Sequence, residues 1–124
     1  MRLTVDLVDM EDTMESKKTR ELCAELVAQG AKIFACVASL MQTSGWPDRY
    51  ISHIKWSGWL EMKDEKTVLR TNQKIVIRDL RKRHTPVAVL RFVGDVLRLE
   101  DEEGNLWVET DAEHLLEELA GCMI

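Results

Sequence analysis

The chain has 124 residues, of which 45% are hydrophobic and 31% charged, and its formal net charge is −5. These values predict one soluble globular domain over residues 1–124, with a core at about 12–93 and a C-terminal hairpin and helix at 95–121. No apolar run approaches the roughly 18 residues of a membrane span, so we expect no membrane partner. The acidic residues 1–12 argue against a secretory signal peptide, and three cysteines without C-x-x-C spacing favour reduced thiols in the cytoplasm.

The charges are unevenly distributed along the chain. Residues 63–91 carry 9 basic and 3 acidic residues, a balance of +6, whereas residues 92–124 carry 1 basic and 10 acidic residues, a balance of −9. A local basic face can contact phosphates even in a protein that is acidic as a whole. The acidic last third is expected to face solvent or a partner subunit.

The first third of the chain predicts two strands around a helix. Residues 3–8 fit a short edge strand, and residues 12–29 fit a helix with Leu22 and Leu26 on its apolar face. Residues 31–38 are apolar at nearly every position, which predicts a strand covered on both sides, although a helix also fits this composition.

Two short strands, at residues 46–54 and 58–63, are predicted to form a hairpin. Asp48 opens the first strand, and Glu61 and Lys63 share one face of the second, because side chains two apart in a strand point the same way. Antiparallel pairing would bring Asp48 beside Glu61. Two carboxylates and an ammonium group converging at the end of a sheet suit a divalent-metal site with a charged helper.

Pro47-Asp48 and, after twelve intervening residues, Glu61-Met62-Lys63 resemble the motif of PD-(D/E)xK nucleases. The run Gly-Trp-Pro-Asp-Arg from residue 45 resembles the G-x-P-D signature of stand-alone VRR-NUC domains and of archaeal-type Holliday junction resolvases. Each piece alone is common at strand ends, but their order along the chain is that of the motif. The resemblance implies a restriction-endonuclease-like α/β fold, Mg²⁺ or Mn²⁺ as cofactor, DNA as partner and a homodimer.

A strong helix is predicted from about Leu69 to Arg83. Its apolar stripe contains Gln73, which needs a hydrogen-bond partner if it is buried. The resemblance implies that Gln73, ten residues after Lys63, points at the catalytic centre. It also implies that an adjoining basic stripe follows a DNA backbone. The alternative for Gln73 is that it lies at the boundary of the core and caps a loop. The alternative for the basic stripe is an ordinary face exposed to solvent. The apolar stripe is Leu69, Gln73, Val76 and Leu80, and the basic stripe is Arg70, Lys74, Arg78 and Arg81.

The remaining elements are a strand at residues 86–93, a hairpin at 96–99 and 105–108, and a helix that a capping box opens at 110–113. The predicted order is helix, strand, strand, strand, helix, strand, which is that of the restriction-endonuclease-like core, followed by the hairpin and the last helix. Trp107 is expected to be exposed in a dimerisation surface or, alternatively, to pack in the core.

The resemblance implies a role for each candidate residue. The metal ligands would be Asp48, Glu61, the Met62 carbonyl and a glutamate of the first helix, Glu21, with Glu25 as the alternative. Lys63 would orient the attacking water or stabilise developing charge, and Gln73 would position Lys63 or the water. The DNA-binding residues would be Arg49, Arg70, Lys74 and Arg78.

The implied reaction is metal-assisted hydrolysis of DNA phosphodiester bonds, with branched DNA such as Holliday junctions as substrate. A sequence-specific restriction-type or homing-type endonuclease, or a non-catalytic DNA-binding or assembly protein on the same fold, are the alternatives. No H-E-x-x-H, G-x-x-x-x-G-K-[ST], G-x-G-x-x-G or G-x-S-x-G motif occurs, so zinc proteases, P-loop NTPases, dinucleotide-binding enzymes and serine hydrolases find no support.

Overall fold

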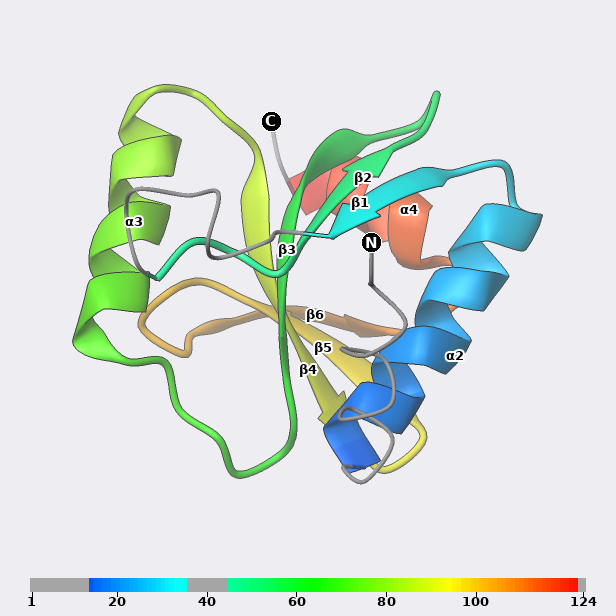
Figure 1. Ribbon diagram of the computed structural model, residues 1–124, viewed down its shortest axis with the longest axis horizontal. Helices are drawn as coiled ribbons and strands as arrows, with labels where there is room; N and C mark the ends of the chain where they lie inside the picture. Colours follow the sequence, from blue (N-terminus) through cyan, green and yellow to red (C-terminus); the bar gives the residue numbers. More distant parts are fainter. Residues whose placement is uncertain (1–13, 36–44, 123–124) are drawn as a thin grey trace, which may run out of the picture.

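The computed structural model of the chain describes residues 14–35 and 45–122. These residues form a six-stranded sheet and three helices (Figure 1). The predicted strand at residues 3–8 lies outside the described residues. The strands are β1 (Lys32–Ala35), β2 (Arg49–Ser52), β3 (Ser57–Lys63), β4 (Val87–Val93), β5 (Val96–Glu100) and β6 (Leu106–Thr110), and the helices are α2 (Met14–Ala28), α3 (Thr71–Lys82) and α4 (Leu115–Cys122).

The strands lie side by side in the order of the sequence, from β1 to β6. Neighbouring strands are antiparallel except β3 and β4, which are parallel. A parallel pair needs a crossover connection, and α3 provides it. The order helix, strand, strand, strand, helix, strand, with an added hairpin and helix, is the predicted one.

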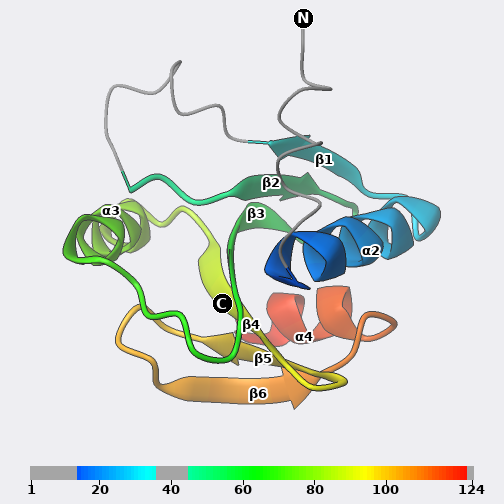
Figure 2. The same ribbon diagram turned by 60° about the horizontal axis from the view of Figure 1, so that its bottom comes forward.

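The helices cover opposite faces of the sheet (Figures 1 and 2). Helices α2 and α4 pack on one face, where the larger apolar core lies, and α3 packs on the other face against β4. Side chains of β3 alternate between the two: Leu60 and Met62 belong to the core under α2, whereas Trp59 packs against the core under α3. Glu61, between Leu60 and Met62, therefore points to the α3 side of the sheet.

Helix α3 buries the face that the sequence predicts. Gln73, Val76 and Leu80 are buried, as is Leu69 in the loop before the helix. Their three- and four-residue spacing places them on one side of the helix. The helix begins at Thr71 because Arg70 has an extended backbone.

Two expectations are wrong in detail. The strand predicted to be covered on both sides is β1, an edge strand in which Phe34 is 57% exposed and only Ile33 packs against the core. Of the two interpretations of Trp107, the structure supports packing in the core, because the side chain is half-buried against it. Helix α4 begins later than the capping box suggested, because Asp111 accepts a hydrogen bond from the His114 N–H at 2.9 Å in a separate turn.

Within residues 14–35 and 45–122, no helix has the length and apolarity needed to cross a membrane.

Candidate active site

The hairpin of β2 and β3 brings together the two parts of the predicted motif. Arg49 pairs with Leu60 across the hairpin, so Asp48 lies just before β2 and beside the second half of β3. The Asp48 Oδ2 accepts a hydrogen bond from the Met62 N–H at 3.0 Å. Since the N–H and C=O of one strand residue point to the same edge, the Met62 carbonyl faces the Asp48 side as well.

Glu61 and Lys63 project from β3 toward α3. The Glu61 side chain is only 2% exposed, and Lys63 Nζ lies 3.5 Å from its Oε2. The Lys63 ammonium also favours the ionised form of Asp48 electrostatically. The structure thus gathers both carboxylates and the ammonium group near the C-terminal end of β3.

Gln73 connects Glu61 to the start of α3. Its Nε2 donates a hydrogen bond to Glu61 Oε2 at 3.1 Å, and its Oε1 accepts one from the Arg70 N–H at 2.8 Å. A buried amide needs partners for both its donor and its acceptor, and these two contacts supply them. Gln73 therefore holds the buried carboxylate and the first turn of α3 in one arrangement.

Gly45, the first residue of the G-x-P-D run, lies against α3. A Cβ atom at this position would stand 2.7 Å from the backbone C and O of Asn72 and 2.9 Å from the N of Gln73. Its φ of +89° is in the left-handed region, which side-chain-bearing residues rarely adopt. Glycine therefore lets the loop that leads to Asp48 approach the first turn of α3 and fixes the two relative to each other.

Burial raises the pKa of Asp48 above its ordinary value, because a carboxylate loses hydration when it is removed from water. The Met62 N–H and the cations Arg49, Lys63 and Arg70 act in the opposite direction without cancelling this effect. A bound cation would favour the ionised carboxylate, so the site is electrostatically suited to one.

The available donors fit a hard divalent cation. Asp48, Glu61 and the Met62 carbonyl offer oxygen atoms, which Mg²⁺ and Mn²⁺ prefer. Within the part of the chain that the structure describes, no group of three or more His, Cys, Asp or Glu side chains could hold a metal ion. Two carboxylates are nevertheless sufficient for Mg²⁺, which usually keeps several of its water ligands.

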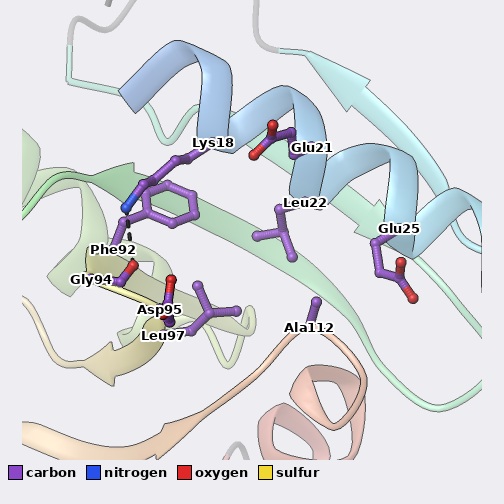
Figure 3. Close-up of a pocket in the computed structure, with 9 residues that line it drawn as sticks. All are labelled: Lys18, Glu21, Leu22, Glu25, Phe92, Gly94, Asp95, Leu97 and Ala112. Carbon is purple, nitrogen blue, oxygen red and sulfur yellow. Dashed lines mark hydrogen bonds between the residues drawn. The ribbon is translucent and has the colours of Figure 1, made fainter. Parts of the chain in front are cut away.

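Glu21 does not lie with these carboxylates. It projects from α2, the helix on the face of the sheet opposite Glu61, and lines an open cavity of about 300 Å³ near the β4–β5 turn (Figure 3). Lys18 lines the same cavity and donates a hydrogen bond from Nζ to the Gly94 carbonyl at 3.0 Å. Glu25 lies there too, so both glutamates stand outside the group formed by Asp48 and Glu61.

The candidate DNA-binding residues do not lie together. Arg70 is the exposed residue before α3 and acts electrostatically on Asp48. Arg49 pairs with Leu60, which belongs to the core under α2, and interacts with Cys23 of α2, so its side chain lies on the opposite face of the sheet from Glu61. Lys74 and Arg78 lie farther along α3 and face the turn between β5 and β6, where Glu103 pairs with both.

Sequence reasoning missed a buried ion pair beside the site. Arg91 on β4 lies 3.1 Å from Glu100 on β5 and donates to the carbonyls of Asp64 and Thr67 at 2.6 Å each. It thereby ties the loop that follows Lys63 to the sheet. The sequence does contain a signal for this pair. Arg91 lies inside an otherwise apolar strand, where a charge needs a buried partner.

No protein-family model and no curated protein matches the chain. A solved structure does match: that of Hjc, a Holliday junction resolvase from the archaeal hyperthermophile Archaeoglobus fulgidus. The match has a TM-score of 0.56 at 18% sequence identity and covers 87% of this chain and 99% of that chain. The chain shares the fold of that resolvase. The predicted restriction-endonuclease-like α/β fold is thereby confirmed, and at this identity the likeness extends to the fold alone.

Proposed function

We propose that the chain is a metal-dependent endonuclease that hydrolyses DNA phosphodiester bonds, with branched DNA such as Holliday junctions as its preferred substrate. The main support is the convergence of Asp48, Glu61 and Lys63 at the end of β3. Glu61 is buried, and the Gln73 amide and the Lys63 ammonium both contact its Oε2. Burying a carboxylate is costly, so its retention at this position favours a functional role.

Each side chain has its own part in the mechanism. Asp48, Glu61 and the Met62 carbonyl would hold Mg²⁺ or Mn²⁺, which, when bound, would polarise the scissile phosphate and lower the pKa of a bound water. The Lys63 ammonium, kept near Glu61, stabilises the negative charge that develops on the phosphate oxygens. Gln73 keeps Glu61 oriented during the reaction.

Arg70 neutralises a phosphate next to the scissile bond in this proposal. Its support is that Arg70 is exposed just before α3 and acts electrostatically on Asp48. Glu21, on the opposite face of the sheet, takes no part in the reaction.

Branched DNA as substrate and a homodimer as the active form go together. The similar structure is that of a Holliday junction resolvase, which supports a four-way junction as substrate. Resolving a junction requires a cut in each of two strands, and the described part of the chain offers one candidate site. A symmetric dimer would present two matched sites to the symmetric junction.

The test is a cleavage assay on a four-way junction, a flap, a linear duplex and a supercoiled plasmid, each with Mg²⁺, Mn²⁺ or EDTA. The variants are Lys63→Ala and, as a control that removes the same charge outside the site, Lys66→Ala. We expect metal-dependent cleavage of the junction that Lys63→Ala abolishes and Lys66→Ala preserves.

Two results would redirect the proposal. Cleavage of linear duplex at fixed sequences would indicate a restriction-type or homing-type enzyme. Binding of DNA with no cleavage under any metal condition would indicate a non-catalytic DNA-binding protein on this fold.

A further inference from the structure

The turn between β5 and β6, residues 101–105, lies against the basic stripe of α3 (Figure 1). Two glutamates of this turn contact three cations of the helix. The contacts are Arg81 Nε to Glu102 Oε1 at 2.8 Å, Arg78 Nε to Glu102 Oε2 at 3.8 Å, Lys74 Nζ to Glu103 Oε1 at 3.9 Å, and an ion pair between Arg78 Nη2 and Glu103 Oε2. The stripe proposed to follow DNA is thus occupied by carboxylates of the same chain.

Carboxylates and phosphates are interchangeable ligands for such a stripe. The guanidinium group presents the same fork of N–H donors to either anion. Lys74, Arg78 and Arg81 lie at i, i+4 and i+7, so they share one helix face and spread over about 10 Å along its axis. A DNA strand presents a phosphate every 3.4 Å or so of its helix axis, so a few consecutive phosphates match this length.

We propose that the 101–105 turn is an intramolecular substitute for DNA phosphates and that the substrate backbone displaces it from α3 during binding. The proposal rests on the nuclease function above and describes how its DNA-binding surface is regulated. The closed turn competes with DNA. The apparent affinity for DNA is therefore the intrinsic affinity multiplied by the fraction of molecules in which the turn is open. DNA that offers few phosphates to the stripe is therefore discriminated against.

The contacts between the turn and α3 differ in exposure: the Arg81–Glu102 pair is only 24% and 14% exposed, whereas the contacts of Glu103 are open to solvent. The side chains of Lys74, Arg78 and Glu103 are 36%, 47% and 45% exposed, and ion pairs this exposed are weak. A cavity of about 110 Å³ lies between the start of α3 and the turn, lined by Lys74, Glu102 and Glu103 among others. The interface is therefore open and polar rather than closely packed.

The turn also keeps its own shape without α3. The Asp101 Oδ1 accepts hydrogen bonds from the N–H groups of Glu103 and Asn105 at 2.8 and 2.9 Å. The pairing of β5 with β6 is irregular between Leu99 and Glu100, just before the turn. Such bulges bend strands locally, so the direction in which the turn leaves the sheet is set at this point.

The stripe adjoins the candidate active site along the same helix. Lys74 follows Gln73, whose amide contacts Glu61. A DNA strand laid along α3 in place of the turn would therefore approach Glu61 at the N-terminal end of the helix. Displacement of the turn and delivery of a phosphate to the carboxylates are then coupled.

The test is the affinity for a four-way junction in EDTA, where no cleavage occurs. The variant Glu102→Gln with Glu103→Gln removes the two charges of the turn and keeps the side-chain volume. The matched control is Glu113→Gln with Glu117→Gln, which removes two exposed charges at α4, on the other face of the sheet. We expect the turn variant to bind at least about tenfold more tightly than wild type at low salt, and the control to change affinity by less than about threefold.

The salt dependence gives a second readout. Salt weakens the ion pairs that close the turn in wild type, so the affinity difference between wild type and the turn variant should shrink as salt rises, whereas the control variant should follow wild type throughout. Equal gains in the two double variants, or no binding of DNA by wild type and turn variant alike, would overturn the proposal. Failure of the proposed nuclease function would give a different result: the wild type would bind the junction in EDTA but would not cleave it in Mn²⁺. If circular dichroism shows that the turn variant does not fold, the single variants Glu103→Gln and Glu113→Gln provide the same comparison. The expected gain in affinity is then smaller.

Discussion

Replacing Gly45 with alanine tests whether the G-x-P-D loop is fixed against α3. The substitution places a Cβ 2.7 Å from two backbone atoms of Asn72, well inside ordinary contact distance, in a residue with φ of +89°. The left-handed conformation alone costs about 1–2 kcal/mol for alanine. Relieving the overlap by shifting the loop or the helix adds roughly 1–3 kcal/mol.

Gly104 provides the matched control. Its φ is +86°, almost that of Gly45, but no atom lies within 4 Å of where its Cβ would stand. Gly104→Ala should therefore cost only the conformational part, about 1–2 kcal/mol. The difference between the two variants isolates the contact with α3, which we expect to be about 1–3 kcal/mol.

The assay is urea unfolding followed by circular dichroism, with the free energy of unfolding extrapolated to water for wild type and both variants. Since the shift passes to Gln73 and from there to Glu61, Gly45→Ala should also slow cleavage. Destabilisation of the two variants that agrees within about 0.5 kcal/mol would refute the reasoning.

Three further predictions follow from the same site. Gln73→Leu removes the donor to buried Glu61 and the acceptor of the Arg70 N–H, so it should lower the free energy of unfolding in urea by about 2–4 kcal/mol; a loss below about 1 kcal/mol would show that these bonds do not hold the site. Saturating Mn²⁺ should raise the melting temperature of wild type but not of Glu61→Ala, and an unchanged wild type would count against a metal site. The hydrogen bond from the Thr67 hydroxyl lowers the pKa of Asp64, so this residue stabilises the fold above its ordinary pKa of 3.8 and the contribution is lost as pH falls through the lower folded pKa. Asp64→Asn should accordingly flatten the acid limb of the stability profile, measured as the urea midpoint between about pH 2 and pH 5, and an unaltered limb would contradict this assignment.

The local geometry of the site could be predicted from sequence because two periodicities determine it. The alternation of side chains along a strand puts Glu61 and Lys63 on one face, and hairpin pairing sets Asp48 beside them. The helical repeat places Gln73 on the buried stripe of α3, where its amide reaches Glu61. Both relations join elements that are adjacent in the sequence, β2 with β3 and β3 with α3.

Longer-range relations were not accessible in this way. Periodicity shows which face of α2 is buried but not which face of the sheet α2 covers, so Glu21 was assigned to a site on the other side. The opposite charges of the second and last thirds of the chain were visible, but not that one turn of the acidic part would pair with α3. The edge position of β1 likewise depends on the order of strands in the sheet, which composition does not encode.

The sequential strand order has a consequence for folding. Each strand of the sheet pairs with its neighbour in sequence, so the longest connection closed by strand pairing is the crossover through α3. The antiparallel pairs close short connections, whereas the parallel pair of β3 and β4 must wait until the crossover through α3 closes. The residues of the candidate site lie between positions 45 and 73 and need the β2–β3 hairpin, α3 and the strand β4 against which α3 packs. The site can thus form within one short, contiguous stretch of chain, before β5 and β6 join the sheet.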